Sequence, residues 1–185
     1  MSDTSASSDP SDPRRAVLDR EGLFAPLAAA ERDALAPRLV RRAFKAGEAM
    51  VRQGDAGDSL FLIVEGNLSA MFSTGGKPAR EAGKLGPGDC FGEMSLLTGA
   101  PRSATVLARS PGVAFELAKD DVAPILKARP AIAAELGQLL ARRQRVLDAI
   151  AAEHPELERV DAKTLGKTIG GWILAGFQIA PGAII

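Results

Sequence analysis

The residues best suited to chemistry lie in one stretch, 86–106, with the sequence GPGDCFGEMSLLTGAPRSATV. Gly92 lets the backbone approach a ligand closely, and a short helix that starts there points the free N–H groups of its first turn outward. Such a helix start attracts anions. Arg102, at the start of the next predicted strand, adds a planar fork of donors that suits phosphate oxygens. The stretch therefore predicts a phosphate site.

Two neighbouring side chains refine this prediction. Ser103 offers a hydroxyl and a backbone N–H, and Glu93 places a carboxylate beside the expected phosphate. A carboxylate there needs a partner of its own, and a sugar hydroxyl next to the phosphate is the natural one. The alternatives are a Glu93 that only caps the short helix and an Arg102 in a loose surface salt bridge. Phosphate and ribose together indicate a nucleotide.

The wider pattern carries a family resemblance. The segment FGEMSLLTGAPRSATV, with AGEAMVRQGDAGDSLFLIVEGNLSAMF upstream, closely resembles the phosphate-binding cassette and preceding strands of cyclic-nucleotide-binding domains. The resemblance covers about residues 20–150, and the family includes the regulatory domains of protein kinase A and of bacterial cyclic-nucleotide-regulated channels. It implies a mainly β fold with flanking helices: an eight-stranded jelly-roll β-barrel with N-terminal helices and a long C-terminal lid helix.

The same resemblance implies which residues contact the ligand. Arg102, Ser103 and backbone N–H groups around 92–95 would hold the exocyclic phosphate of cAMP or cGMP, while Glu93 takes the ribose 2′-hydroxyl. The closing helix would fold over the base. Serine at position 103 is common in cAMP binders and threonine looks like the cGMP-favouring variant, so we expect cAMP. The expected ligand-binding residues are Gly92, Glu93, Met94, Ser95, Arg102, Ser103 and Ala104, and the lid candidates are Leu136, Leu139, Leu140 and Arg143.

Composition limits the other possibilities. The chain has 185 residues, 46% of them hydrophobic and 25% charged, which is typical of one soluble globular domain. The 23 Lys and Arg balance the 23 Asp and Glu, so no overall field attracts nucleic acid, and we expect no nucleic-acid partner. One cysteine, Cys90, and one histidine, His154, cannot build a disulfide or a zinc cluster. We therefore expect no metal and no cofactor besides the nucleotide ligand.

Turn and hydropathy signals divide the chain. We expect a disordered tail at 1–13, the binding domain at 14–155 and an apolar tail of unknown role at 156–185. Within the domain, two short helices precede a barrel at about 41–118, and C-terminal helices occupy about 119–153. A short helix at 119–128 precedes a longer one that starts at Pro130. Apolar runs between glycine and proline turns predict strands at 60–64, 68–72, 105–108 and 113–117.

The end of the chain is unusual because Thr168–Ile185 contains 18 residues without a charge. This length touches the lower limit for a membrane span, but four glycines, a proline and Gln178 disfavour one. The alternatives are a segment packed on the barrel, an interaction tail or an unstructured end. The N-terminus lacks the apolar stretch of a signal peptide, so we expect a cytoplasmic protein.

These features predict a sensor rather than an enzyme, because the chain offers no catalytic residues: no activated nucleophile, paired carboxylates or metal ligands. We expect nucleotide binding to move the helix from Pro130 onward and so to regulate a protein partner such as a channel, transporter or kinase. The apolar stripe from Leu136 to Ile150 fits a lid, a homodimer seam or a core helix. A DNA-binding role is disfavoured by the short chain after that helix. The alternatives are a scaffold module without nucleotide binding and, disfavoured by the single histidine, a cupin-like enzyme.

Overall fold

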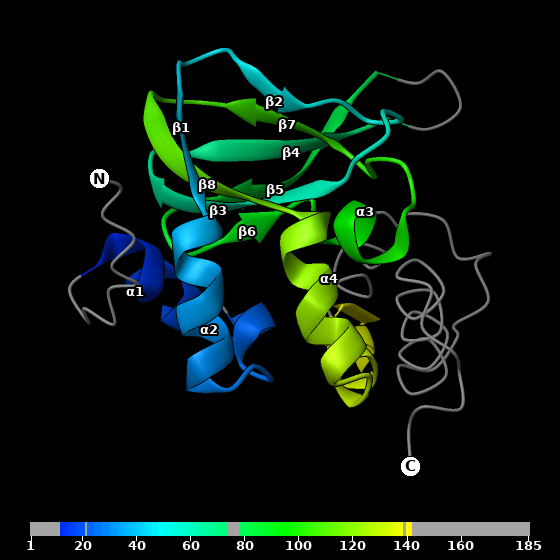
Figure 1. Ribbon diagram of the computed structural model, residues 1–185. Coiled ribbons are helices and arrows are strands. Elements are labelled where there is room, and N and C mark those ends of the chain that lie inside the picture. The colour runs from blue at the N-terminus through cyan, green and yellow to red at the C-terminus, as the bar shows by residue number, and fades with distance from the viewer. Residues whose placement is uncertain (1–11, 21, 74–77, 139, 142–185) are drawn as a thin grey trace.

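The computed structural model describes residues 12–20, 22–73, 78–138 and 140–141 (Figure 1). The helical elements are α1 (Pro13–Arg20), η1 (Gly22–Phe24), α2 (Ala29–Leu35), η2 (Ala36–Arg38), α3 (Glu93–Thr98) and α4 (Lys119–Ala128), and residues 131–138 are also helical. The strands are β1 (Val40–Phe44), β2 (Ala49–Val51), β3 (Ser59–Glu65), β4 (Leu68–Phe72), β5 (Arg80–Leu85), β6 (Cys90–Phe91), β7 (Thr105–Ala108) and β8 (Gly112–Ala118).

The strands of this part of the chain form two four-stranded antiparallel sheets. Sheet A has the order β1-β8-β3-β6, and sheet B has the order β2-β7-β4-β5. Neighbours in a sheet are mostly distant in sequence, so the chain crosses repeatedly between the two sheets. Gly66, with φ of 95°, makes the tight turn by which the chain leaves β3 in sheet A and enters β4 in sheet B.

The helices and the two sheets lie in layers, with sheet A in the middle (Figure 1). Alternate residues of β3 point to opposite faces: Leu60 and Leu62 pack with the helices, whereas Phe61 and Ile63 pack between the sheets. The Phe61 ring stacks on Phe91 of β6, with ring centroids 4.9 Å apart. Strand β3 is therefore buried on both faces, which explains its unbroken apolar run.

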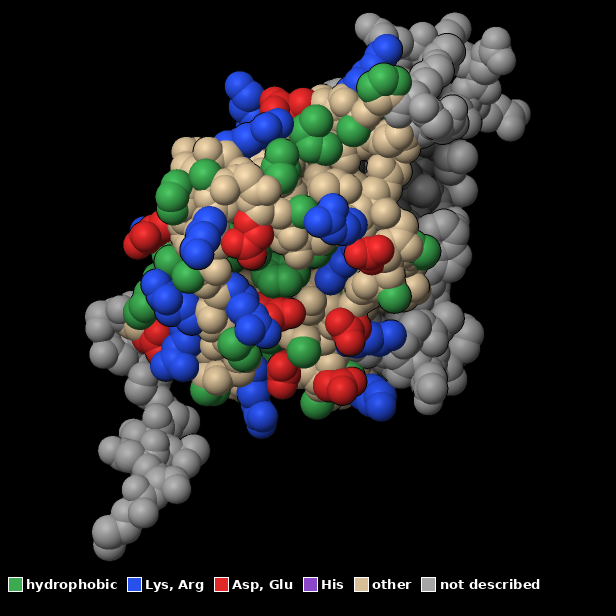
Figure 2. All heavy atoms as spheres, turned by 90° about the horizontal axis from the view of Figure 1, so that it is seen from above, with side chains coloured by type: hydrophobic (Ala, Val, Ile, Leu, Met, Phe, Trp, Pro, Cys, Tyr) green, Lys and Arg blue, Asp and Glu red, His purple; other side chains and the backbone are tan. Residues whose placement is uncertain are grey.

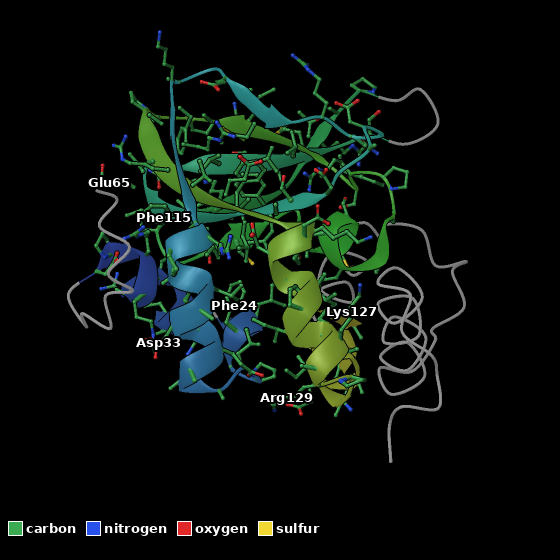
Figure 3. All side chains as sticks on the ribbon, in the orientation of Figure 1. Phe24, Asp33, Glu65, Phe115, Lys127 and Arg129 are labelled. Atoms are coloured by element: carbon green, nitrogen blue, oxygen red, sulfur yellow. The ribbon has the colours of Figure 1, made fainter. Side chains whose placement is uncertain are left out.

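Polar contacts cap the starts of α1 and α2 and connect the start of α2 with the end of α4. The backbone N–H of Arg14 donates to the Asp12 carboxylate at 2.9 Å, which caps the start of α1. Glu31 accepts the N–H of Ala28 at 2.7 Å at the start of α2 and also pairs with Arg129 at 2.6 Å after the end of α4. Figure 3 shows Phe24 between α2 and α4, where it packs in the apolar cluster of this layer.

Most elements that the apolar runs predict are confirmed. The four runs correspond to β3, β4, β7 and β8, and the helix predicted at 119–128 is α4. The charged strands β1 and β5 escaped prediction because their sequences, VRRAF and REAGKL, show no alternation of apolar and polar residues. The two sheets agree with the mainly β fold, whereas closure into a jelly-roll barrel stays a prediction.

Several predictions concern residues that the structure does not describe. The predicted tail lies outside the described residues up to position 11, and α1 already begins at Pro13. The apolar end of the chain, 156–185, also lies outside them. The predicted long lid helix is described at 131–138 and 140–141 alone, and its remainder lies outside the described part.

The two-sided burial of β3 makes a testable prediction. Leu62→Ala and Ile63→Ala should each lower the free energy of unfolding by about 2 to 5 kcal/mol, because both side chains are fully buried, in different layers. Val40→Ala, at a side chain 51% exposed, should change it by less than about 0.5 kcal/mol. Urea unfolding measures all three. A sheet exposed on one face would leave one of the two buried-site variants near the wild-type value.

Candidate anion-binding site

The site forms where β6 ends and α3 begins. Gly92 lies between them with φ of 85°, a left-handed conformation that side chains rarely adopt. Its carbonyl accepts the Leu96 N–H at 3.1 Å, so α3 starts at once after the strand. Gly99, with φ of 76°, ends the helix after six residues. The turn thus directs the N–H groups of the first helical turn to one place beside β3 and β6.

Arg102, in the segment between α3 and β7, points its guanidinium toward this turn. The residue is 7% exposed. Nη1 donates to the carbonyl of Ser59 at 2.6 Å and to that of Gly92 at 3.1 Å, and Nη2 donates to the Ser59 hydroxyl at 3.2 Å. The arginine therefore connects the start of β3 with the start of α3, two elements that are far apart in sequence.

The loop between β2 and β3 forms the other side of the site. The Arg102 N–H donates to the Asp55 carbonyl at 2.8 Å, and the Gly54 N–H donates to the Arg102 carbonyl at 2.9 Å. Gly57 lies so close to the guanidinium that a Cβ atom at this position would overlap Nε and Cζ of Arg102. The loop holds Arg102 by its backbone and leaves room for its side chain through the missing Cβ of one glycine.

The charge of Arg102 is not neutralised by a direct partner. Among the described residues, its three hydrogen bonds go to uncharged oxygens, and no carboxylate reaches ion-pair distance. Burial lowers the pKa of its guanidinium, and the more distant carboxylates of Asp58, Glu116, Glu93 and Asp55 partly oppose this change. Within the described part of the chain, the Nε–H at one edge of the guanidinium has no acceptor. That edge of the guanidinium is the one that binds two oxygens of a phosphate.

The structure brings some of the predicted ligand residues together and leaves others further out. Gly92 and Arg102 are in direct contact, and Glu93 is close enough to influence the pKa of Arg102. Ser95 is buried at 1% exposure, and Met94 packs against the helical layer. Of the two residues that follow the arginine, Ser103 is exposed and Ala104 is half-buried. All of the seven flank the same turn, while their contacts with a ligand stay a prediction.

Two of the four predicted lid residues have side chains that the structure describes. Leu136 and Leu140 are buried in the cluster of the helical layer. Leu136 lines a small apolar cavity of about 20 Å³ together with Leu96 and Leu97 of α3. Leu136 therefore shares this cavity with α3 and belongs to the helical layer. The side chain of Leu139 and the whole of Arg143 lie outside the described residues.

Sequence reasoning missed the residues that hold Arg102. Ser59 contacts the guanidinium through both its carbonyl and its hydroxyl, and Gly57 makes room for it. The segment QGDAGDS indicates a turn, because it contains two glycines three residues apart. The spacing does not predict which residue this turn contacts in the folded chain.

Comparison with known proteins agrees with this geometry. Residues 41–129 match the family model described as cyclic nucleotide-binding domain. This segment, just under half of the chain, is similar to that family. The match spans β8, α3 and Arg102, so the site lies inside the matched segment. The family is described by what it binds, and that description names no catalytic activity.

Regulatory proteins are among the relatives. The chain is 36% identical over 126 residues to the cyclic AMP receptor protein of Thermus thermophilus, covering 68% of this chain and 58% of that protein. It is 45% identical over 87 residues to the cAMP-dependent protein kinase regulatory subunit of Mycosarcoma maydis, covering 46% of this chain and 16% of that protein. The chain thus spans less than two thirds of either relative.

A solved structure shares the fold. The regulatory domain of Toxoplasma gondii protein kinase A, crystallised with cAMP, superposes with a TM-score of 0.64 at 25% identity. The match covers 89% of this chain and 60% of that chain.

In the residues that our structure describes, no helix has the length and hydropathy of a membrane span, and no group of His, Cys, Asp or Glu is arranged to hold a metal ion.

The close approach of Gly57 to Arg102 is testable. Gly57→Ala should weaken binding of a cyclic nucleotide at least about tenfold, because the added Cβ displaces the guanidinium and costs one charge-assisted hydrogen bond or more. Gly83→Ala is the matched control, since nothing lies within 4 Å of a Cβ at that glycine of β5. Isothermal titration calorimetry measures both. Equal affinities for the two variants would show that the position of the guanidinium does not matter for binding.

Proposed function

We propose that this chain binds a cyclic nucleotide, cAMP in preference to cGMP, as a regulatory sensor without catalytic activity. The observation that carries the proposal is the buried guanidinium of Arg102, whose hydrogen bonds within the described residues go only to uncharged oxygens. A buried charge needs compensation, and a phosphodiester at the free edge of the guanidinium would supply it. The similarity of residues 41–129 to the family supports the same ligand class.

The proposed phosphate contacts account for a useful affinity. The exocyclic oxygens would accept hydrogen bonds from Arg102 and from the N–H groups at the start of α3, with Ser103 on the same side. Hydrogen bonds to charged groups contribute about 1.5 to 3 kcal/mol each. A few of them, together with burial of the purine, reach the roughly 8 kcal/mol that corresponds to micromolar binding.

The sugar and the base would be held by the neighbouring residues. Glu93, the first residue of α3, would accept the ribose 2′-hydroxyl, and Ala104 would line the pocket beside the phosphate. Serine at position 103 supports cAMP over cGMP. Leu136, Leu139, Leu140 and Arg143 are the proposed lid residues. The relatives that match this chain are named for cyclic AMP, which supports the same choice.

The helix α3 provides a route from the ligand to the rest of the molecule. Its start faces the phosphate, whereas Leu96 and Leu97 are buried against the helical layer. These two leucines line the small cavity together with Leu126 of α4 and Leu136. A shift of α3 on binding phosphate would therefore change the packing of residues 131–138, and this change would be the output to a regulated partner such as a kinase, channel or transporter.

Thermal unfolding tests the ligand assignment. At a hundredfold excess over the dissociation constant, cAMP should stabilise the protein by about 2.7 kcal/mol, and cGMP should do so less at equal concentration. Arg102→Ala should remove most of this stabilisation, measured against the variant's own ligand-free melting temperature. Arg41→Ala, at an exposed arginine of β1, is the control and should respond like the wild type.

Linear AMP separates the proposed site from a general nucleotide pocket. It has the same base and sugar but lacks the cyclic phosphodiester, so it should give little stabilisation. Equal protection by linear AMP would contradict the assignment. No shift with any nucleotide would favour the scaffold function over the sensor.

Amide hydrogen exchange tests the proposed coupling. Saturating cAMP should slow exchange at residues 131–138, and Leu96→Ala should reduce this difference, because the truncated side chain no longer connects α3 with the helical layer. Leu68→Ala removes an equally buried leucine from the cluster between the sheets and serves as the control. If both variants keep the wild-type response to cAMP, the signal does not pass through α3.

A further inference from the structure

Gln53, just after β2, makes a set of hydrogen bonds that tie three segments together. Its side-chain Oε1 accepts the Ser73 N–H at 2.9 Å, and its Nε2 donates to the Ser73 carbonyl at 2.9 Å. Its own backbone N–H donates to the Thr105 hydroxyl at 3.0 Å. The amide therefore pairs with the backbone after β4 in the way that a neighbouring strand would, while its backbone is bound to the first residue of β7.

The need for this contact follows from the topology of sheet B. In that sheet β7 lies between β2 and β4, so within the sheet these two strands are connected only through β7. Strand β7 begins at Thr105, and the chain before it, at Ser103 and Ala104, is not in the sheet. These two residues therefore make no strand hydrogen bonds with β2 or β4. The side chain of Gln53 spans the interval and bonds the end of β4 directly.

The same loop holds the arginine of the site. The residues that follow Gln53 are the ones whose backbone pairs with Arg102, through the Gly54 N–H at 2.9 Å and the Asp55 carbonyl at 2.8 Å. Gly57, further along the loop, packs against the guanidinium. The position of Arg102 thus depends on a loop whose first anchor to sheet B is Gln53.

We propose that Gln53 is a positioning residue of the nucleotide site. It holds the β2–β3 loop at the end of β4. Residues 102–104, which precede β7, then keep the conformation that points Arg102 at the phosphate. The inference rests on the proposed function and adds to it a residue that has no place in the phosphate-binding stretch itself. An amide is suited to the role because only a group with one donor and one acceptor can pair with both backbone groups of Ser73.

The test replaces this amide by a carboxyl group of the same shape. In Gln53→Glu at pH 7.5, the charged oxygen faces the Ser73 carbonyl without a proton to donate, and we expect about tenfold weaker cAMP binding by calorimetry. At a lower pH, where the carboxyl group is protonated, it can donate to the Ser73 carbonyl again. The ratio of the variant's dissociation constant to that of the wild type should then fall to about two or less.

Wild-type values at each pH remove the effect of the other carboxylates. Asp55, Asp58, Glu93 and Glu116 influence Arg102 in both proteins, so their effect cancels in the ratio. Gln138→Glu makes the same chemical change at an exposed position of residues 131–138 and should give a ratio of about one at both pH values. Gln53→Leu keeps the volume, removes both polar atoms and should bind about tenfold more weakly at either pH.

Each outcome decides the inference. A ratio near one at pH 7.5 for Gln53→Glu and Gln53→Leu overturns it, and so does a loss in Gln53→Glu that does not recover at the lower pH where the carboxyl group is protonated. If Gln53→Glu does not fold at pH 7.5, Gln53→Leu decides at that pH. If the wild type binds neither cAMP nor cGMP, the proposed function fails. The positioning role is then read from the ligand-free protein by NMR, where the Arg102 Nε–H resonance should shift in Gln53→Leu and stay in place in Gln138→Glu.

Discussion

The site depends on one buried cation that is held by uncharged groups. Removing a guanidinium from water is costly unless it gains both hydrogen bonds and an opposite charge. Arg102 has the hydrogen bonds, to the carbonyls of Ser59 and Gly92 and to the Ser59 hydroxyl, but no anion in direct contact among the described residues. Its Nε edge and the start of α3 are thereby prepared for a ligand that carries negative charge, and such a ligand would complete what the protein leaves unbalanced.

The fold around this cation explains why a two-sheet architecture suits the task. Strand β3 of sheet A is buried on both faces, so β3 and β6 form a stiff base from which α3 and Ser59 project. The loop from sheet B approaches from the other side and holds the backbone of Arg102. On the outer face of the molecule, by contrast, acidic and basic side chains are interspersed, as Figure 2 shows. The charge that matters is local, in agreement with equal totals of acidic and basic residues.

The short helix α3 has a polar start at the site and an apolar surface in the helical layer, and this arrangement suits the proposed sensor. Its start and its preceding glycine belong to the polar site, whereas Leu96 and Leu97 belong to the apolar helical layer with α4 and Leu136. In the proposed sensor, these buried leucines would pass a displacement of α3 on to the helical layer. The relatives with a similar domain are regulatory proteins, and the chain covers only part of each of them.

The sequence by itself determined the apolar strands, the helix α4 and the turn at Gly92 with Arg102 nearby, because each is encoded by residues that are close along the chain. Hydrophobic runs and glycine spacing act locally and can be recognised without a partner. Only the tertiary structure decided that Ser59 and Gly57 contact Arg102, that Gln53 bonds Ser73, and that the charged strands β1 and β5 complete the two sheets. These contacts join segments far apart in sequence, and most of them have a backbone group as one partner, which every residue type carries alike, so the pattern of side chains does not predict them.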